Sequence, residues 1–159
     1  MTAKSKARHG RRAAFSHLNE RGAARMVNVS TKPAQPRRAV ASAQLVCRPE
    51  TIRALRTKAL PKGDVLAVAN IAGIQAAKRT ADLIPLCHPL PIDHVELRFA
   101  MRRAGVEIFC AVETTAKTGV EMEALTGAAV AALTLYDMCK AVDKTMRIEG
   151  IRVVKKEKL

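Results

Sequence analysis

The 159-residue chain is poor in aromatic residues, which make up 3% of it, and it has no tryptophan. Its core must therefore be built mainly from alanine, valine, leucine, isoleucine and methionine. The hydrophobic share of 48% is enough for one real core, and the length suits one domain. An alanine-rich interior favours close helix packing, and it often leaves apolar faces that a second subunit covers.

Cysteine is scarce, and the four cysteines form no Cys-x-x-Cys pair: Cys47, Cys87, Cys110 and Cys139. Metal sites and disulfide frameworks usually show tighter spacing than this. We therefore expect free thiols in a reducing compartment and no metal site.

Long apolar runs are also missing. The longest, such as Ala128–Leu133, fall far short of the ~20 residues that a membrane-spanning helix needs. The basic N-terminus continues into Ala, Phe and Ser rather than into an apolar run, so no signal peptide is visible. These absences predict a cytoplasmic protein without a membrane partner.

Acidic residues are outnumbered, with 14 Asp and Glu against 28 Lys and Arg, and the formal net charge is +14. Five basic residues lie in an acid-free N-terminal stretch, which leaves about +9 for the rest of the chain. We interpret residues 1–14 as a disordered basic tail and residues 15–159 as a single α+β domain. A surface this cationic attracts nucleic acid, nucleotide phosphates or an acidic membrane. The alternative is a cationic protein with no specific anionic partner.

Hydrophobic periodicity predicts alternating strands and helices. The expected strands are Met26–Ser30, Arg38–Cys47, Val95–Met101, Val106–Val112 and Met146–Lys155. The expected helices are Pro49–Lys58, Val65–Thr80 with Asp64 as its N-cap, and a long helix, Val120–Val142. From residue 38 this order is that of an α+β, ferredoxin-like split βαβ domain, in which a four-stranded antiparallel sheet packs against helices.

The long helix carries charged groups on a face that is otherwise apolar or small. Thr118 and Glu121 fit a capping box, which would explain Glu121 structurally, whereas Glu123 has no such explanation. Steps of three and four residues from Glu123 lead through apolar and small positions to Asp137 and Lys140 on the same face. The alternative is that the two ends of this face simply emerge into water.

Fourteen residues separate Glu123 from Asp137, which is roughly 21 Å along a helix. The two carboxylates cannot flank one reacting bond within one subunit. Either they contact opposite ends of a long ligand, or they belong to different sites, which a subunit interface could bring together.

Other basic groups could contact an anion, although each could equally be ordinary surface charge or a structural group: Lys62 in a turn before a helix, His88 in a proline-stiffened loop, Lys78, Arg79, Lys32, Arg37 and Arg38. The chain has no P-loop, no dinucleotide fingerprint and no Ser-His-Asp arrangement. The residues alone thus predict an anion-handling α+β protein with dispersed acid and base groups.

Longer runs are similar to the cyclic pyranopterin monophosphate synthase family, the second-step enzymes of molybdenum cofactor biosynthesis (protein C of that pathway). The similarity covers about residues 26 to 154. It is carried by Lys62-Gly63-Asp64-Val65, by Ala72-Gly73-Ile74-Gln75-Ala76-Ala77-Lys78, by Leu83-Ile84-Pro85-Leu86-Cys87-His88-Pro89, and by the long helix over residues 117–125 and 135–142.

The resemblance implies a lyase whose substrate is the cyclised GTP derivative 3′,8-cyclo-7,8-dihydro-GTP. Such an enzyme rearranges this compound into cyclic pyranopterin monophosphate and releases pyrophosphate, with no metal or organic cofactor. The family is expected to form a homo-hexamer, a trimer of dimers, with the site at a dimer interface. Its partner is a small molecule, and neither nucleic acid nor membrane is expected.

Carried onto this chain, the family's catalytic residues fall on Lys62, Asp137 and Lys140. Its substrate-binding residues fall on Leu86, Cys87, His88, Met122 and Glu123, with Arg37 and Lys32 as phosphate contacts. Two departures stand out. Asn28 replaces an aspartate that is usual in the family, and the chain ends in Lys155-Lys156-Glu157-Lys158-Leu159 without the Gly-Gly-Lys-rich tail of many relatives.

Two other function classes compete with this one. The charge favours a nucleic-acid-binding module, although aromatic stacking platforms and known binding motifs are missing. Asn28 favours a catalytically impaired relative that serves as a structural subunit. A turnover assay separates both from the enzyme.

Overall fold

Four strands form one antiparallel sheet in the computed structural model, which describes residues 17–18, 21–57 and 63–159. The strands are β1 (Gln35–Val46), β2 (His94–Arg102), β3 (Gly105–Ala116) and β4 (Arg147–Lys158), and their order across the sheet is β2-β3-β1-β4. The helices are α1 (Pro49–Arg56), α2 (Val65–Lys78), the single turn α3 (Thr80–Leu83) and α4 (Glu121–Cys139). This connectivity and strand order confirm the predicted ferredoxin-like α+β fold. The predicted basic tail, residues 1–14, lies outside the described residues.

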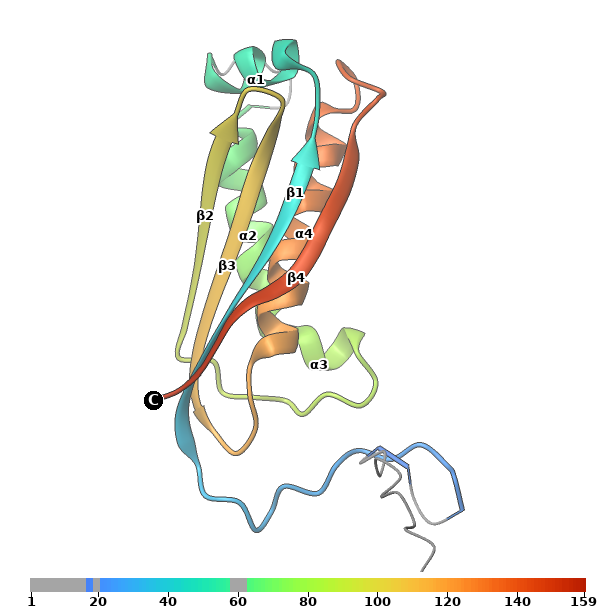
Figure 1. The fold of residues 1–159 in the computed structure, drawn as a ribbon, viewed down its shortest axis with the longest axis vertical. Helices are drawn as coiled ribbons and strands as arrows, with labels where there is room; N and C mark the ends of the chain where they lie inside the picture. The colour runs from blue at the N-terminus through green and yellow to red at the C-terminus, as the bar shows by residue number, and fades with distance from the viewer. Residues whose placement is uncertain (1–16, 19–20, 58–62) are drawn as a thin grey trace, which may run out of the picture.

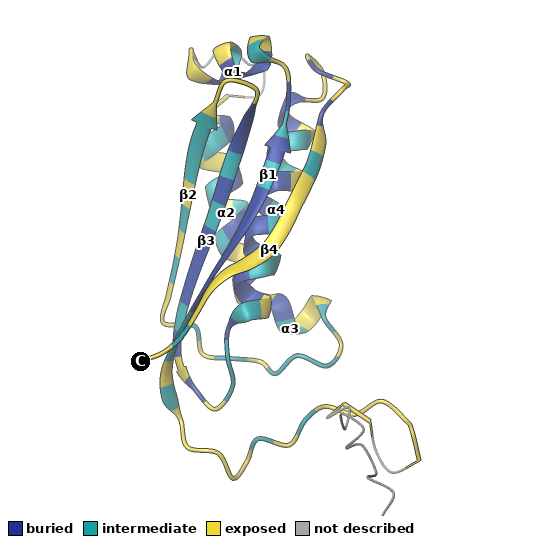
Figure 2. Ribbon diagram, in the orientation of Figure 1, coloured by how far each residue is buried: buried dark blue, intermediate teal, exposed yellow. Residues whose placement is uncertain are grey.

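The helices α2 and α4 cover one face of the sheet (Figure 1). Alternate residues of the two central strands point toward them and are fully buried, such as Ala41 and Leu45 in β1 and Ile108 and Cys110 in β3. Figure 2 shows the resulting gradient: β1 and β3 are largely buried, whereas the edge strand β4 is exposed along most of its length. No helix among the described residues is long and apolar enough to cross a membrane.

Small residues let α2 and α4 approach each other closely, as the alanine-rich composition predicts. Their contact is centred on two glycines, Gly73 and Gly127. A Cβ atom on Gly73 would lie 3.0 Å from the carbonyl oxygen of Gly127 and would overlap the side chain of Leu97. A Cβ atom on Gly127 would lie 2.6 Å from the sulfur of Cys110. Glycine at position 73 therefore permits the close approach of the two helices, and glycine at position 127 permits the close approach of α4 to β3.

Two local signals act as predicted at the starts of helices. Pro49 occupies the first turn of α1, where its missing N–H costs no hydrogen bond. The Asp64 side chain caps α2 by accepting a hydrogen bond of 3.1 Å from the backbone N–H of Ala67.

The capping box predicted for α4 is wrong. The N-cap residue of this helix is Val120, and no side chain caps it. The Glu121 carboxylate instead pairs with the ammonium group of Lys156 in β4. An ion pair with a distant strand thus replaces the local Thr118–Glu121 arrangement.

The predicted strand Met26–Ser30 is also wrong, because this segment joins no ladder of the sheet. Its backbone groups are engaged locally. The Asn28 side chain accepts a hydrogen bond of 2.9 Å from the N–H of Ser30, and the N–H of Lys32 donates to the carbonyl of Val29 at 3.1 Å. Such Asx-type bonds compete with strand pairing. The segment runs instead as an extended strap below the lower end of the sheet (Figure 1).

A fully buried aspartate holds the opposite end of the molecule together. Asp143, just after α4, accepts hydrogen bonds of 2.9 Å from the N–H of Arg48 and from the hydroxyl of Thr51. It also accepts from the N–H and the hydroxyl of Thr145, at 2.9 and 2.8 Å. Burial alone would raise the pKa of Asp143, but these hydrogen bonds outweigh it and hold the pKa far below its usual value. The carboxylate therefore stays ionised and joins the start of α1 to the loop before β4.

Candidate active site

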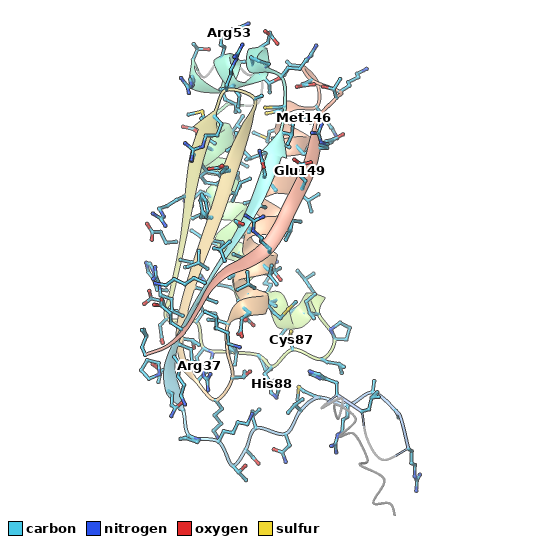
Figure 3. The ribbon with its side chains drawn as sticks, viewed as in Figure 1. Arg37, Arg53, Cys87, His88, Met146 and Glu149 are labelled. Atoms are coloured by element: carbon cyan, nitrogen blue, oxygen red, sulfur yellow. The ribbon has the colours of Figure 1, made fainter. Side chains whose placement is uncertain are left out.

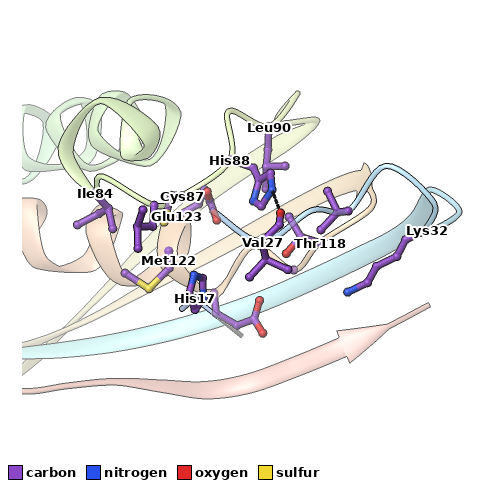
Figure 4. Close-up of a pocket in the computed structure, with 14 residues that line it drawn as sticks. His17, Val27, Lys32, Ile84, Cys87, His88, Leu90, Thr118, Met122 and Glu123 are labelled. Atoms are coloured by element: carbon purple, nitrogen blue, oxygen red, sulfur yellow. Dashed lines mark hydrogen bonds between the residues drawn. The ribbon is translucent and has the colours of Figure 1, made fainter. Parts of the chain in front are cut away.

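A cavity of about 550 Å³ lies at the end of the sheet where β1 begins and β3 ends. Three segments form its walls: the strap with Val27 and Val29, the loop between α3 and β2, and the first turn of α4 (Figure 4). Six of the predicted substrate-binding residues line it, namely Lys32, Leu86, Cys87, His88, Met122 and Glu123. Sequence positions almost a hundred residues apart thus converge on one hollow.

The strap fixes the orientation of the His88 ring. The ring nitrogen Nε2 lies 2.8 Å from the backbone carbonyl oxygen of Val27 (Figure 4). A carbonyl can only accept, so Nε2 carries the hydrogen and Nδ1 of the neutral ring keeps its lone pair. The strap therefore holds His88 in one orientation, as a histidine used for proton transfer or phosphate contact would be held.

Glu123 is the most confined ionisable group of the cavity, since only 4% of its surface is exposed. Burial raises the pKa of Glu123, its own backbone N–H opposes that shift, and the neighbouring charge of Glu121 adds to it. No cationic side chain within the described ranges forms an ion pair with it. A carboxyl group held this way takes up a proton more readily than a surface glutamate.

The thiol of Cys87 faces the same environment. Burial raises its pKa, and the charge of Glu123 raises it further. Cys87 therefore stays protonated at neutral pH, where it can donate a weak hydrogen bond but is a poor nucleophile. The other three cysteines are buried and free as predicted, and burial raises the pKa of Cys110 to about 12.

Basic groups gather around the cavity mouth. Lys156 pairs with Glu121, a lining residue, and Lys117 donates a hydrogen bond of 2.8 Å to the carbonyl of Ser30 in the strap. Arg37 does not line the cavity: its Nε donates to the carbonyl of Ala116 at 3.2 Å, although its charge is near enough to lower the pKa of Glu121. Sequence reasoning assigned no specific contact to Lys156, and only the basic run at the chain end hinted at one.

Two of the three predicted catalytic residues, Asp137 and Lys140, do not join this cavity within one subunit. Asp137 and Lys140 lie in the last turns of α4, where their charged atoms are 2.7 Å apart and both side chains are more than half exposed. The hydrogen bond from Lys140 to Asp137 raises the pKa of Lys140, so its ammonium form persists at neutral pH. Lys62, the third predicted residue, lies outside the described residues. The roughly 21 Å along α4 that separates Asp137 from Glu123 is thus retained in the fold.

Replacing Glu123 by glutamine is expected to raise the thermal unfolding midpoint at pH 7 by a few degrees. The pKa of its carboxyl group is higher in the folded than in the unfolded chain. Ionisation of Glu123 therefore destabilises the fold once the pH rises above the unfolded value. The gain should disappear below about pH 4, where the carboxyl is protonated in both states. Thermal unfolding at both pH values measures this. The exposed Glu96→Gln serves as control, and a Glu123→Gln protein that is less stable at pH 7 would contradict the argument.

Comparison with known proteins decides the family. The model of the MoaC family matches residues 26–158. This range includes the strap, helices α1 to α4 and all four strands of the sheet. The chain belongs to the MoaC family. The resemblance seen in the sequence is thereby confirmed.

Curated relatives within the family match nearly the whole chain. A protein of Chloroflexus aggregans named cyclic pyranopterin monophosphate synthase is 54% identical over 144 residues, which cover 89% of this chain and 87% of the relative. One of the same name from Thermomicrobium roseum is 56% identical over 146 residues, covering 91% and 88%. A molybdenum cofactor biosynthesis bifunctional protein of Chlorobaculum tepidum is 56% identical over 139 residues, 87% of this chain but 45% of its own length.

The matched region contains the cavity residues Val27 to Glu123 and the Asp137–Lys140 pair. The described residues include no group of three or more His, Cys, Asp or Glu side chains arranged to hold a metal ion.

Proposed function

We propose that this chain is a lyase that converts 3′,8-cyclo-7,8-dihydro-GTP into cyclic pyranopterin monophosphate with release of pyrophosphate. The observation that carries the proposal is the identity of more than half over about nine tenths of the chain with relatives named for this product. The volume of the cavity, about 550 Å³, lies within the range of small-molecule sites and suits a nucleotide-derived substrate. We assign the reaction to residues 15–159 and place it in the cytoplasm.

Polar groups in the cavity, and Arg37 beside it, have roles that their positions support. Nδ1 of His88 accepts a proton or a hydrogen bond from the ring system of the substrate. Glu123, whose pKa is raised by burial, exchanges a proton with a ring nitrogen during ring opening. Lys32 and Arg37 stabilise the phosphate charge as the cyclic ester closes and pyrophosphate leaves.

The remaining chemistry belongs to Lys62, Asp137 and Lys140. Lys140 is held in its ammonium form by Asp137, so it supplies a proton or stabilises a developing negative charge. Because this pair lies about 21 Å from Glu123, we propose that the cavity of one subunit is completed by the Asp137–Lys140 end of α4 from another. The assembly is a homo-hexamer, a trimer of dimers.

Exposed apolar side chains on the outer faces of α2 and α4 support this assembly. Leu133 is 58% exposed, between the cavity end of α4 and the Asp137–Lys140 pair, and Ile71 of α2 is 57% exposed. Val68, one turn before Ile71, is exposed as well. Large apolar residues gathered on neighbouring helices are typical of a surface that a partner covers.

Replacing Leu133 by glutamate is therefore expected to dissociate the hexamer into smaller species and to lower turnover in parallel. A charge on this face must be desolvated in the interface without a counter-ion. Sedimentation velocity measures the change in mass. Ala104→Glu, which adds the same charge at the exposed turn between β2 and β3, should leave the hexamer intact. A Leu133→Glu protein that remains hexameric would exclude this face as the interface.

The function itself is tested by giving the purified chain 3′,8-cyclo-7,8-dihydro-GTP and measuring pyranopterin and pyrophosphate. Formation of both in equal amounts is the expected result. Binding of the substrate without turnover would instead indicate a catalytically impaired relative. Strongly salt-dependent binding of long RNA or DNA with no turnover would favour the nucleic-acid-binding alternative.

A further inference from the structure

A second hollow lies at the opposite end of the sheet from the cavity. It has a volume of about 540 Å³ and lies between α1 and the turn that joins β2 to β3. β3 runs from Gly105 beside this hollow to Ala116 near the cavity, and its twelve residues span roughly 36 Å at ~3.3 Å per residue. Figure 3 shows the separation, with Arg53 at one end of the molecule and His88 at the other. A substrate in the cavity does not reach this place.

Four arginines line the hollow, which we call the arginine groove: Arg53 and Arg56 from α1, Arg102 from the end of β2, and Arg103 from the turn that follows. All four side chains belong to exposed residues, and Glu50 is the one acidic residue among the lining residues that the structure describes. Guanidinium groups thus stand on two walls that face a common space. The fold gathers more positive charge here than it neutralises.

Two of the four arginines form ion pairs with neighbouring glutamates. Arg53 holds Glu50 at 2.8 Å, and Arg102 holds Glu107 at 2.7 Å. Across the ranges that the structure describes, Arg56 and Arg103 form no ion pair. Exposed pairs of this kind contribute little to stability, so the fold does not need four arginines at this place. A guanidinium group matches a carboxylate with two parallel hydrogen bonds, and two such groups remain available.

Apolar residues contribute the rest of the lining. Ile52 is buried and Met101 is half-buried, one beneath each wall. Methionine adapts its shape to an inserted side chain and is common at peptide-binding surfaces. No aromatic ring lines the groove in the described chain, so a nucleic-acid base would find no stacking platform. The combination suits an aliphatic side chain with a carboxylate on each side of it.

We propose that the arginine groove is a docking site for an acidic segment of a partner protein, in which Asp or Glu residues flank an aliphatic residue. Charge complementarity carries the proposal: three more guanidinium groups than carboxylates line the groove, on a chain of net charge +14. The groove is separate from the proposed catalytic groups, because neither the cavity residues nor Asp137 and Lys140 line it.

The proposal is tested on the full-length chain by fluorescence anisotropy with two labelled peptides, Glu-Leu-Glu-Leu-Glu and Glu-Ser-Glu-Ser-Glu, at low salt. The leucine peptide should bind more tightly. The double variant Arg56→Glu/Arg103→Glu should weaken its binding by about tenfold or more, because two charge-assisted contacts become repulsions. Arg98→Glu/Arg152→Glu, the same charge change at exposed strand positions, should weaken it less than about threefold.

Three results would overturn the proposal. Equal weakening by both double variants would show unspecific attraction to the cationic surface. Equal binding of both peptides would show that the groove does not recognise an aliphatic side chain. A single-stranded oligonucleotide or pyrophosphate that binds more tightly than the leucine peptide, and is lost in Arg56→Glu/Arg103→Glu, would make the groove a phosphate site. Turnover of the cyclised GTP derivative should be unchanged in this variant, so failure of the docking site is distinguishable from failure of the proposed enzyme.

Discussion

Replacing Lys140 by alanine is expected to lower turnover of the cyclised GTP derivative by about a thousandfold, the range in which a general acid or base contributes. The side chain is exposed, and it forms an ion pair with Asp137 three residues earlier, so the variant should fold normally. Product formation under saturating substrate measures the effect. Lys144→Ala removes an exposed lysine four residues further along the chain and should retain full activity.

A second substitution at the same position separates proton transfer from charge. Lys140→Arg keeps the positive charge beside Asp137, but an arginine is not deprotonated in proteins and cannot pass a proton to the substrate. If Lys140 transfers a proton, the arginine variant should be nearly as inactive as the alanine variant. Recovery of activity in Lys140→Arg would leave the lysine a purely electrostatic role, and full activity of Lys140→Ala would exclude it from the site.

Mixing two inactive variants tests whether the site is shared between subunits. If Lys140 of one protomer completes the cavity that holds Glu123 of another, a dimer of Lys140→Ala and Glu123→Gln protomers has one intact site and one doubly altered site. Random exchange at equal amounts should then restore about a quarter of the wild-type activity. If no activity returns although the subunits exchange, both residues act within one protomer.

Of the substitutions proposed here, removal of the Asp143 side chain is expected to cause the largest loss in the free energy of unfolding. Asp143→Ala leaves the N–H groups of Arg48 and Thr145 and the hydroxyl of Thr51 without their buried acceptor. The loss should be about 3 kcal/mol, which corresponds to a fall of roughly 10 °C in the unfolding midpoint. Thermal unfolding at constant protomer concentration measures it, with the exposed Glu96→Ala as control.

The pH dependence of this loss follows from the sign of the pKa shift. The pKa of Asp143 is lowered in the folded chain, so its stabilising contribution is present above the unfolded value near pH 4 and is lost as pH falls toward the folded value. The difference between the wild-type chain and Asp143→Ala should therefore be constant from pH 5 to 8 and shrink only in acid. A difference that varied across neutral pH would contradict this explanation.

Local signals in the sequence were sufficient for the order of the strands and helices. Alternation over Val95–Met101 and Val106–Val112, the proline at position 49 and the cap Asp64 each act within a few residues, and each is found as predicted. Element ends moved by a few residues. β3, for example, continues to Ala116 because β1 offers partners as far as Gln35, which the composition of either strand alone does not reveal.

Contacts between distant segments were not predictable in this way. The bond from Arg48 to Asp143 joins residues 95 positions apart, and the capping box at Thr118 was lost to an ion pair with a strand that forms the edge of the sheet. The strap does not form a strand because the Asn28 side chain accepts a hydrogen bond from the N–H of Ser30, two residues later. The carbonyl of Val27 is the hydrogen-bond partner of His88. For the site, the residues alone offered anion contacts with open alternatives, and the family resemblance selected among them. The cavity gathers six of that set, and the roles of these six stay predictions, as do those of Asp137, Lys140 and Lys62.

The strand order has a consequence for how the chain folds. The last strand of the chain, β4, pairs only with the first, β1, and the register places Lys158 opposite Arg37. Until β4 has paired, β1 can pair with β3 and pack against both helices, but its other edge stays open. An open edge is a template for pairing with a neighbouring chain. Pairing of β4 with β1 thus moves the free edge of the sheet from the largely buried β1 to the exposed, charged β4, whose lysine side chains disfavour pairing with a neighbouring chain.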